Sequence, residues 1–407
     1  MRKQGYNYVI LGSIQEIVAM RLGYLDTEKL TPTFELGPIR PPSEAYSLLI
    51  RATRNCPWNK CLFCSTYKGS KFELRAVEEI KKDIESAKAI SEGIKEIAWR
   101  KGYGNRVKEV AAMLYNQPEY GPCVPNVASW LWAGAESAFL QDSNSLIMRT
   151  TELVEVITFL KKTFPDLARI TSYARSHTAA RKSLEELKGL RDAGLNRIHI
   201  GLESGYEPLL NYMQKGATAK QHIDGGKKVK EADISLCEYV MPGLGGKTMS
   251  LEHARETARV LNEIDPDYIR LRSLHVRPGM PLWDKWQEGD FEMQTEDEVV
   301  REIGIFVDNL QVTSQLKSDH VLNLLPEIEG KMPEDKQKCL DIIDKYLSLP
   351  YEERLTFRLG RRAGYYEGLA DFQDSYKHDK IEETIKRIRS QGGDVEETIF
   401  KLKGGFI

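Results

Sequence analysis

The sequence predicts an α/β fold: a partial (β/α)6, TIM-like barrel with an N-terminal helical arm and a mainly helical C-terminal extension. Two observations predict it. Strand-like and helix-like segments alternate about six times between residues 46 and 278, which is typical of parallel strands joined by right-handed helical crossovers. The chain also has 407 residues, enough for one barrel of ~250 residues with further segments at both ends.

We expect three parts along the chain. Residues 1–45 form the helical arm, which ends in the turn-rich segment GPIRPPSEA. Residues 46–285 form the partial barrel, with an insertion at 91–136 that holds Gly, Pro and three Trp. Residues 286–407 are rich in Lys, Glu and Leu and form helices that cover the barrel.

Six strands of the barrel are predicted from short apolar segments. In chain order they are AYSLLIRAT (45–53), SAFLQD (137–142), ARITSYARS (168–176), RIHIGLESG (197–205), ISLCEYVMPGLGG (234–246) and DYIRLRSLHV (267–276).

The helices between these strands are predicted from helical spacing and from capping boxes. Apolar residues at helical spacing mark one helix, at Leu153, Val156, Ile157 and Leu160. Capping boxes begin two later helices, at Ser183 with Glu186 and at Thr218 with Gln221. A further helix is expected at 251–263.

Composition narrows the functional class. With 41% hydrophobic residues, 29% charged residues and a net charge of −2, the chain resembles an ordinary globular protein and not one built to coat nucleic acid. No apolar run reaches the ~20 residues of a membrane helix, and the N-terminus has no signal-peptide layout. Six cysteines, three of them clustered, do not suggest a secreted disulfide framework. We therefore expect a protein of the reducing cytoplasm.

The most informative segment is RATRNCPWNKCLFCSTYKG, residues 51–69. Cys56, Cys61 and Cys64 are spaced C-x4-C-x2-C directly after the first predicted strand, and no fourth cysteine follows nearby. Three thiolates can hold three irons of a 4Fe–4S cluster and leave the fourth iron free for a small molecule. The spacing therefore favours a cluster with one open iron.

Two other interpretations of the cysteines remain. Structural zinc requires four Cys or His ligands, but the nearest histidine in sequence is His177, and the other cysteines are scattered at 123, 237 and 339. A thioredoxin-like C-x-x-C would use Cys61 and Cys64, but it leaves Cys56 without a role.

The loop resembles the cluster loop of the radical S-adenosylmethionine superfamily. The usual spacing there is C-x3-C-x2-C with an aromatic residue before the last cysteine; here Phe63 has that place, and one extra residue separates Cys56 from Cys61. The resemblance covers roughly residues 46–280. It looks closest to the branch with oxygen-independent coproporphyrinogen oxidase-like proteins and radical methylthiotransferases.

The resemblance implies two cofactors and a reaction type. The three cysteines would bind a 4Fe–4S cluster whose free iron chelates S-adenosylmethionine. Reductive cleavage of S-adenosylmethionine would then give a 5′-deoxyadenosyl radical that abstracts hydrogen from the substrate. Such an oxidoreductase or transferase would be handled anaerobically and would need a flavodoxin- or ferredoxin-like electron donor.

Further motifs resemble those that contact S-adenosylmethionine. HIGLESG resembles the fourth-strand motif, which implies that Glu203 and Ser204 meet the ribose or methionine end; a simple turn is the alternative. VMPGLGG resembles the fifth-strand glycine-rich motif near the adenine, with Gly243 at its centre, although any strand-to-helix turn carries glycines. The second strand ends in FLQDSNS without the family's Gly-Gly-Glu, so Asp142 and Asn144 would supply the acceptors unless they cap a helix.

Arginines at strand ends are candidates for the methionine carboxylate. Arg175 follows the third strand, and Arg270 and Arg272 alternate on the sixth, which predicts that both lie on one strand face.

Substrate-side candidates follow the sixth strand. His275 and Arg277 lie in SLHVRPGMPL, and Asp319 and His320 lie in KSDHVLNLL. A solvated loop or a cap is the alternative for both segments. Cys123 could donate a hydrogen atom or carry a methyl group, although a lone cysteine is more often a core residue.

The sequence therefore predicts a radical S-adenosylmethionine enzyme with a small, anionic substrate, such as an organic acid or a tetrapyrrole-like metabolite. We expect no nucleic-acid partner, no membrane and no second cofactor. The alternatives are a radical enzyme that modifies tRNA or a peptide, and a non-catalytic binding protein stabilised by zinc or a cluster.

Overall fold

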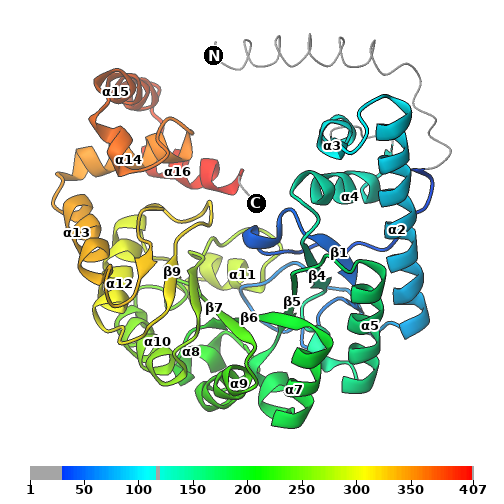
Figure 1. The fold of residues 1–407 in the computed structure, drawn as a ribbon. Coiled ribbons are helices and arrows are strands. Elements are labelled where there is room, and N and C mark those ends of the chain that lie inside the picture. The colour runs from blue at the N-terminus through cyan, green and yellow to red at the C-terminus, as the bar shows by residue number, and fades with distance from the viewer. Residues whose placement is uncertain (1–29, 116–119, 406–407) are drawn as a thin grey trace. The chain divides into compact units, whose positions relative to one another are not determined.

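The computed structural model describes residues 30–115 and 120–405 (Figure 1). Most of the predicted N-terminal arm lies outside the described residues, and the described part of it contains the short 3-10 helix η2 (Pro42–Glu44). The chain divides into two compact units: Met1–Arg54, Glu73–Ser172 and Asp192–Leu195 form the first, and Asn55–Phe72, Tyr173–Arg191 and Asn196–Ile407 form the second. The division into arm, barrel and extension stays a prediction.

The first unit contains three parallel strands in the order β1-β4-β5. They are β1 (Leu48–Arg51), β4 (Ser137–Gln141) and β5 (Arg169–Ala174), whose last two residues belong to the second unit. Most residues of these strands are buried, which is typical of parallel strands. A separate antiparallel pair joins β2 (Thr53–Arg54) to β3 (Glu73–Leu74).

Among the described residues, four α-helices accompany these strands. They are α2 (Val77–Arg100), α3 (Val107–Tyr115), α4 (Cys123–Trp132) and α5 (Thr150–Thr163). Figure 1 shows α2 beside α5, and α3 beside α4. The predicted insertion at 91–136 thus consists largely of helices, and α2 runs across its expected start without a break.

The second unit continues the alternation of strands and helices. Its strands are β6 (Leu195–Glu203), β7 (Ser235–Val240), β8 (Tyr268–Leu271), β9 (Gln315–Lys317) and β10 (Gly330–Lys331). Strands β6 to β9 pair in parallel, and β10 pairs antiparallel to β9. In neither unit do the described strands close into a barrel.

The helices of the second unit lie mainly on one side of these strands, as Figure 1 shows for α8, α9, α10 and α12. They are α6 (Ser176–Arg181), α7 (Leu184–Ala193), α8 (Glu207–Tyr212), α9 (Ala219–Glu231), α10 (Ser250–Ile264), α11 (Pro281–Gln287) and α12 (Glu296–Asp308). The C-terminal residues add α13 (Lys336–Leu347), α14 (Tyr351–Arg362), the 3-10 helix η5 (Leu369–Gln373), α15 (Ser375–Ser390) and α16 (Val395–Gly404).

The predicted α/β class and all six predicted strands are confirmed. Both capping boxes are present: Ser183 and Glu186 exchange hydrogen bonds of 2.9 and 3.1 Å, and Thr218 does the same with Gln221. The short strands β9 and β10 were not predicted, because two or three residues carry too little periodicity to be recognised. No helix among the described residues is long and apolar enough to cross a membrane.

The end of β6 lies unusually close to α10. The Gly205 N–H donates a 2.9 Å hydrogen bond to Thr257 Oγ1. A Cβ atom on Gly205 would lie 2.3 Å from the carbonyl oxygen of Glu256, which is a backbone atom of α10. Only glycine therefore allows the loop after β6 to reach its position.

Gly205→Ala should destabilise the protein by about 1–3 kcal/mol, because the helix backbone cannot rotate away from the added methyl group as a side chain would. The measurement is the midpoint of urea unfolding. Gly189→Ala is the control, since a Cβ there meets nothing within 4 Å and alanine is favoured over glycine inside a helix by roughly 0.5–1 kcal/mol. Equal midpoints for the two variants would show that the close approach costs nothing.

Candidate functional site

The three clustered cysteines lie in the loop 55–72, in the second unit. All three thiols are free and half-buried. Two asparagines with positive φ, Asn55 at 67° and Asn59 at 50°, curl the loop. The backbone N–H of Asn59 points at Cys56 Sγ, 3.4 Å away, and its side chain donates to the carbonyl of Tyr67. These bonds fix the loop from within.

The turn at 213–216, which follows α8, holds the loop from outside. Leu62 N donates to Met213 O at 3.0 Å, and the Trp58 indole donates to Gln214 O at 2.6 Å. Gly216 has φ +63°, and a Cβ there would lie 2.2 Å from the Trp58 ring. Backbone conformation and contact with Trp58 both require glycine at this position.

Arg175, just past β5, joins the same turn to the cysteine loop. It donates to the carbonyls of Lys215 and Gly216 at 2.8 and 2.9 Å, and its guanidinium lies 5.1 Å from the centre of the Trp58 ring. Burial raises the pKa of Cys61, while the charges of Lys215 and Arg175 lower it. Two cations thus lie near thiols that must be deprotonated to bind metal.

Glu203 and Lys215 form an ion pair of 3.0 Å in the second unit. Glu203 has φ +65°, and the register with β7 shifts between Gly201 and Glu203. A Cβ on Gly201 would lie 2.3 Å from Glu203 Oε1, so the carboxylate lies directly over that glycine. Lys215 Nζ lies 5.7 Å from the centre of the Phe63 ring. The structure therefore brings predicted residues from several segments together around the cysteine loop.

Ser204 and Gly243 belong to a buried network instead of an open surface. Ser204 Oγ contacts His253 Nδ1 at 2.9 Å, and His253 Nε2 contacts the carbonyl of Met241 at 3.1 Å. Gly243 N donates to Glu302 Oε1 at 2.7 Å. His253 and Glu302, on α10 and α12, thus position the ends of β6 and β7, although no local motif marked them.

The two arginines of the sixth predicted strand have different environments. Arg270 is buried and forms an ion pair with Asp319. Arg272 lies past the end of β8 and is exposed. The alternation that would place both on one face stops at Leu271, where the strand ends.

His275 and Arg277 follow β8 in the second unit. His275 is buried with its ring 5.2 Å from that of Phe400. Burial lowers the pKa of His275 to about 4, with a further contribution from nearby cations, so the ring is neutral near pH 7. Arg277 Nη2 donates to Ser65 Oγ in the cysteine loop at 3.2 Å.

His320 also has a pKa lowered to about 4 by burial, and its Nδ1 accepts from Leu322 N at 3.2 Å. In the first unit, the Cys123 thiol donates to the Phe34 carbonyl at 3.1 Å and accepts from the Phe34 N–H at 3.3 Å. Burial raises the pKa of the Cys123 thiol.

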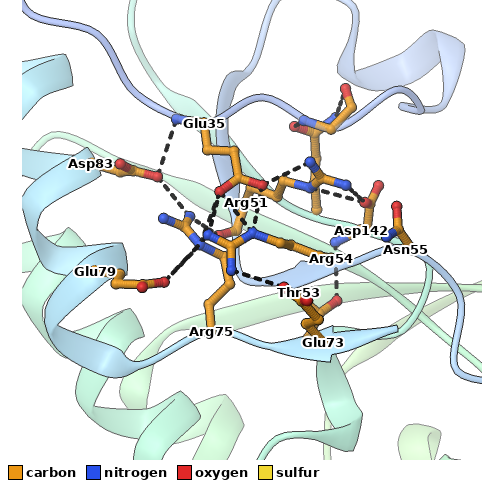
Figure 2. A network of polar contacts seen from close by, with 12 residues as sticks. Glu35, Arg51, Thr53, Arg54, Asn55, Glu73, Arg75, Glu79, Asp83 and Asp142 are labelled. Carbon is orange, nitrogen blue, oxygen red and sulfur yellow. Dashed lines mark hydrogen bonds and ion pairs between the residues drawn. The ribbon is translucent and has the colours of Figure 1, made fainter. Parts of the chain in front are cut away.

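Asp142 lies in the first unit, in a network of acids and arginines shown in Figure 2. Its carboxylate is fully buried and accepts from Arg51 Nε at 3.0 Å and Nη2 at 2.6 Å. A Cβ on Gly37 would lie 2.6 Å from Asp142 Oδ1. Asn144 is also fully buried and provides no side-chain cap for η4 (Ser145–Ile147).

Gln141, the last residue of β4, fixes the N-terminal segment. Its side-chain amide accepts from Gly37 N at 2.9 Å and donates to Gly37 O and Ile39 O at 3.0 and 2.6 Å. Glu35, in the same segment, accepts from Arg51 at 2.8 Å and from Arg54 at 2.7 Å (Figure 2). The end of β4 is thus held by contacts with Gly37 and Ile39 of the same unit.

A buried acid that sequence reasoning missed lies on β7. Glu238 is fully buried, and neither of its side-chain oxygens has a hydrogen-bond partner among the described residues. Burial raises the pKa of Glu238 well above its ordinary 4.5. Burial therefore favours the neutral, protonated form of this side chain. Its only signal in the sequence is an acid inside an apolar strand.

The zinc alternative finds no support in this geometry. Across residues 30–115 and 120–405, no three His, Cys, Asp or Glu side chains lie close enough together to hold a single metal ion. The thiolates of a 4Fe–4S cluster each bind a different iron, so they do not need to converge on one point. The free thiols, nearby cations and hydrogen bond to Cys56 fit such a cluster.

Comparison with known proteins gives a family match over part of the chain. Residues 131–260, from α4 to α10, match the Radical SAM superfamily. A tRNA uridine(34) acetyltransferase of Methanocaldococcus jannaschii is 22% identical over 117 residues, which cover 28% of this chain and 22% of the relative. A tRNA-2-methylthio-N(6)-dimethylallyladenosine synthase of Hahella chejuensis is 30% identical over 89 residues, which cover 21% of this chain and 20% of the relative.

Among solved structures, coproporphyrinogen III oxidase from Escherichia coli has a TM-score of 0.41 and 15% identity, covering 64% of this chain and 52% of that one. The chain spans only about a fifth of the length of the two curated relatives. The match over residues 131–260 confirms the predicted resemblance to the radical S-adenosylmethionine superfamily, whose members are enzymes that use a 4Fe–4S cluster and S-adenosylmethionine.

Replacing Cys56, Cys61 or Cys64 by Ala should abolish the ~400 nm absorbance of a reconstituted cluster, because each thiolate holds its own iron. Cys123→Ala, Cys237→Ala and Cys339→Ala are matched controls, since these three thiols are buried and should keep the full iron content. Iron and absorbance are measured after anaerobic reconstitution. Loss of iron in a control variant would contradict the ligand assignment.

Stability should fall as pH rises above about 4.5, in part because of Glu238. The unfolded chain loses that proton near pH 4.5, whereas the folded state keeps it to a much higher pH. Glu238→Gln should therefore melt at a temperature roughly 2–4 °C higher than the native chain at pH 8, and should show no such gain at pH 4. Glu231→Gln, at an exposed position, should change neither value. An equal gain at both pH values would show that the proton is not involved.

Proposed function

We propose that this chain cleaves S-adenosylmethionine reductively and uses the resulting radical to abstract hydrogen from a small organic acid. The observation that carries the proposal is the cysteine loop itself. It has three free thiols, and it is held by Trp58, Arg175 and the 213–216 turn. Such rigidity suits a cluster whose open iron must be presented to a cofactor.

Specific roles follow for the side chains around the loop. Cys56, Cys61 and Cys64 would hold the cluster. Lys215 is the better candidate for the methionine carboxylate, because Arg175 already donates to two carbonyls. Glu203, paired with Lys215 at 3.0 Å, would receive the ammonium group or the ribose hydroxyls.

A cluster held by Cys56, Cys61 and Cys64 would supply the electron for reductive cleavage of S-adenosylmethionine to methionine and a 5′-deoxyadenosyl radical, which would take a hydrogen atom from the substrate. The chain's own residues bind and orient both molecules. The apolar cluster around Phe63, Met241 and Val276, against which Cys61 and Cys64 pack, would exclude water from the reaction.

The surface of the loop suits an acidic electron donor of the flavodoxin or ferredoxin kind. Residues 55–72 contain three lysines and no acidic residue. Lys60 and Lys71 are exposed, and Lys68 is half-buried. A positive surface of this kind attracts a negatively charged partner.

The second candidate function is modification of RNA. Two relatives are named as tRNA-modifying enzymes, although each match covers about a fifth of the relative. The small-molecule reading is supported by the small, partly enclosed cavity described below. The alternative from another class of protein is a non-catalytic binding protein that is stabilised by zinc or by a cluster.

The test is anaerobic reconstitution followed by reduction. The proposal expects about four irons per chain, production of 5′-deoxyadenosine, and transfer of deuterium into it from one of a panel of labelled organic acids. Glu203→Ala should weaken S-adenosylmethionine binding roughly ten- to a hundredfold at unchanged iron content, because a charged hydrogen bond is lost.

Three results would contradict the proposal in different ways. Tetrahedral zinc without cofactor cleavage would leave only a binding protein. Deuterium transfer from tRNA, and from no small acid, would establish the RNA-modifying function instead. Unchanged affinity in Glu203→Ala would remove that residue from the cofactor site.

A further inference from the structure

We propose that the cavity beneath α16 binds a small hydroxy acid with an apolar body, and that Lys403 anchors its carboxylate. The inference deepens the proposed function, because it names the substrate class, and rests on it. The cavity, of about 150 Å³, lies wholly in the second unit. The loops after β7, β8 and β9 line it together with α12 and α16. A cavity of about this size holds one benzene molecule.

The walls of the cavity are mainly apolar. They include Val276, Val299, Ile303, Leu324, Ile399 and Phe400. Such walls favour a ligand with a hydrocarbon body over a sugar or a nucleotide, because affinity rises with the apolar surface of the ligand and the protein that binding removes from water.

One end of the cavity carries an excess positive charge. Glu296 accepts from Arg362 Nε at 3.1 Å, and Lys403 Nζ lies 3.6 Å from the same carboxylate. Arg362 also donates to the carbonyls of Val321 and Leu322 at 3.0 and 2.9 Å. One carboxylate is therefore shared by two cations, and Arg362 already has close acceptors.

Lys403 is the cation with bonding capacity left. Its ammonium has three donors, yet its contacts with Leu274 O and Glu296 are long, at 3.4 and 3.6 Å. The other acid of the lining, Glu396, is occupied by Arg358 through two bonds of 2.7 Å. Burial lowers the pKa of Lys403, as expected for an ammonium that lacks full compensation. A ligand carboxylate would provide it.

The lining also contains acceptors that need a donor. Gln294 Oε1 and Glu296 Oε2 are buried and have no hydrogen-bond partner among the described residues. A hydroxyl group on the ligand would satisfy one of them. A monoanionic hydroxy acid balances the single excess charge, whereas a zwitterionic amino acid would leave it in place.

The cavity lies one layer of side chains from the cysteine loop. Leu274, Val276 and Met293 line the cavity and also pack in the apolar cluster that contacts Cys61 and Cys64. A ligand held here would therefore be close to the proposed chemistry. The structural alternative is that Lys403 only attaches α16 to the rest of the second unit.

The test is calorimetric binding to the reconstituted full chain without reductant, so that no turnover occurs. The probes are 2-hydroxy-4-methylpentanoate, its primary amide and leucine. The proposal expects the acid to bind at least tenfold more tightly than the amide or leucine. Lys403→Met should lower the affinity for the acid roughly ten- to a hundredfold and leave the amide unchanged. Lys403→Arg should retain binding.

Lys401→Met is the matched control, because Lys401 lies on the same helix, is exposed and pairs with Glu397 at 2.6 Å. It should bind the acid as the native chain does. If the native chain binds the acid and the amide alike, binds leucine more tightly, or binds none of them, the proposal is wrong even if Lys403→Met fails to fold. Acid binding without S-adenosylmethionine cleavage would overturn the proposed function and leave the site intact.

Discussion

The packing of the cysteine loop on the 213–216 turn is the constraint on which the candidate site depends. The loop has no regular secondary structure of its own between β2 and β3, so its shape is set by what it contacts. Trp58, Leu62 and Arg175 all donate hydrogen bonds to backbone carbonyls of that turn. Because these contacts use main-chain atoms of the turn, the position of the thiols follows from the fold of the chain near α8. At position 216 only glycine fits beneath the Trp58 indole.

The same turn supplies the charges of the site. Lys215 extends from it toward Glu203 and the Phe63 ring, while its carbonyl receives Arg175. A single residue thus contributes a cation through its side chain and an acceptor through its backbone. The ends of β6 and β7 are fixed separately, through His253 and Glu302, so the two halves of the predicted cofactor site have independent supports.

The sequence was sufficient for what depends on local pattern. Apolar runs predicted the six strands, capping boxes predicted the starts of two helices, and the C-x4-C-x2-C spacing indicated the resemblance to the radical S-adenosylmethionine superfamily. It was insufficient where partners are distant in the chain. No residue near Arg270 in the sequence indicates its ion pair with Asp319, and none near Gly243 indicates its hydrogen bond with Glu302. Lys403 is likewise distant in sequence from Leu274, a residue after β8 whose carbonyl it contacts. Strands β9 and β10 were not predicted, because their extended conformation depends on pairing with neighbouring strands and not on the β propensity of their own residues.

Glu35 holds the two ends of the cysteine loop together, which bears on the chain entropy that the loop loses on folding. Arg54 directly precedes that loop, Arg75 follows it, and both guanidiniums reach the carboxylate of Glu35, at 2.7 and 3.4 Å (Figure 2). One acid therefore acts as a clasp on the two stems of an otherwise irregular segment. Bringing together the ends of such a segment costs at least about 2 kcal/mol in chain entropy. The ion pairs that offset this entropy loss are formed by residues of the first unit outside the cysteine loop. Contacts within the loop therefore need only orient the thiols, because the two ends of the loop are already held together.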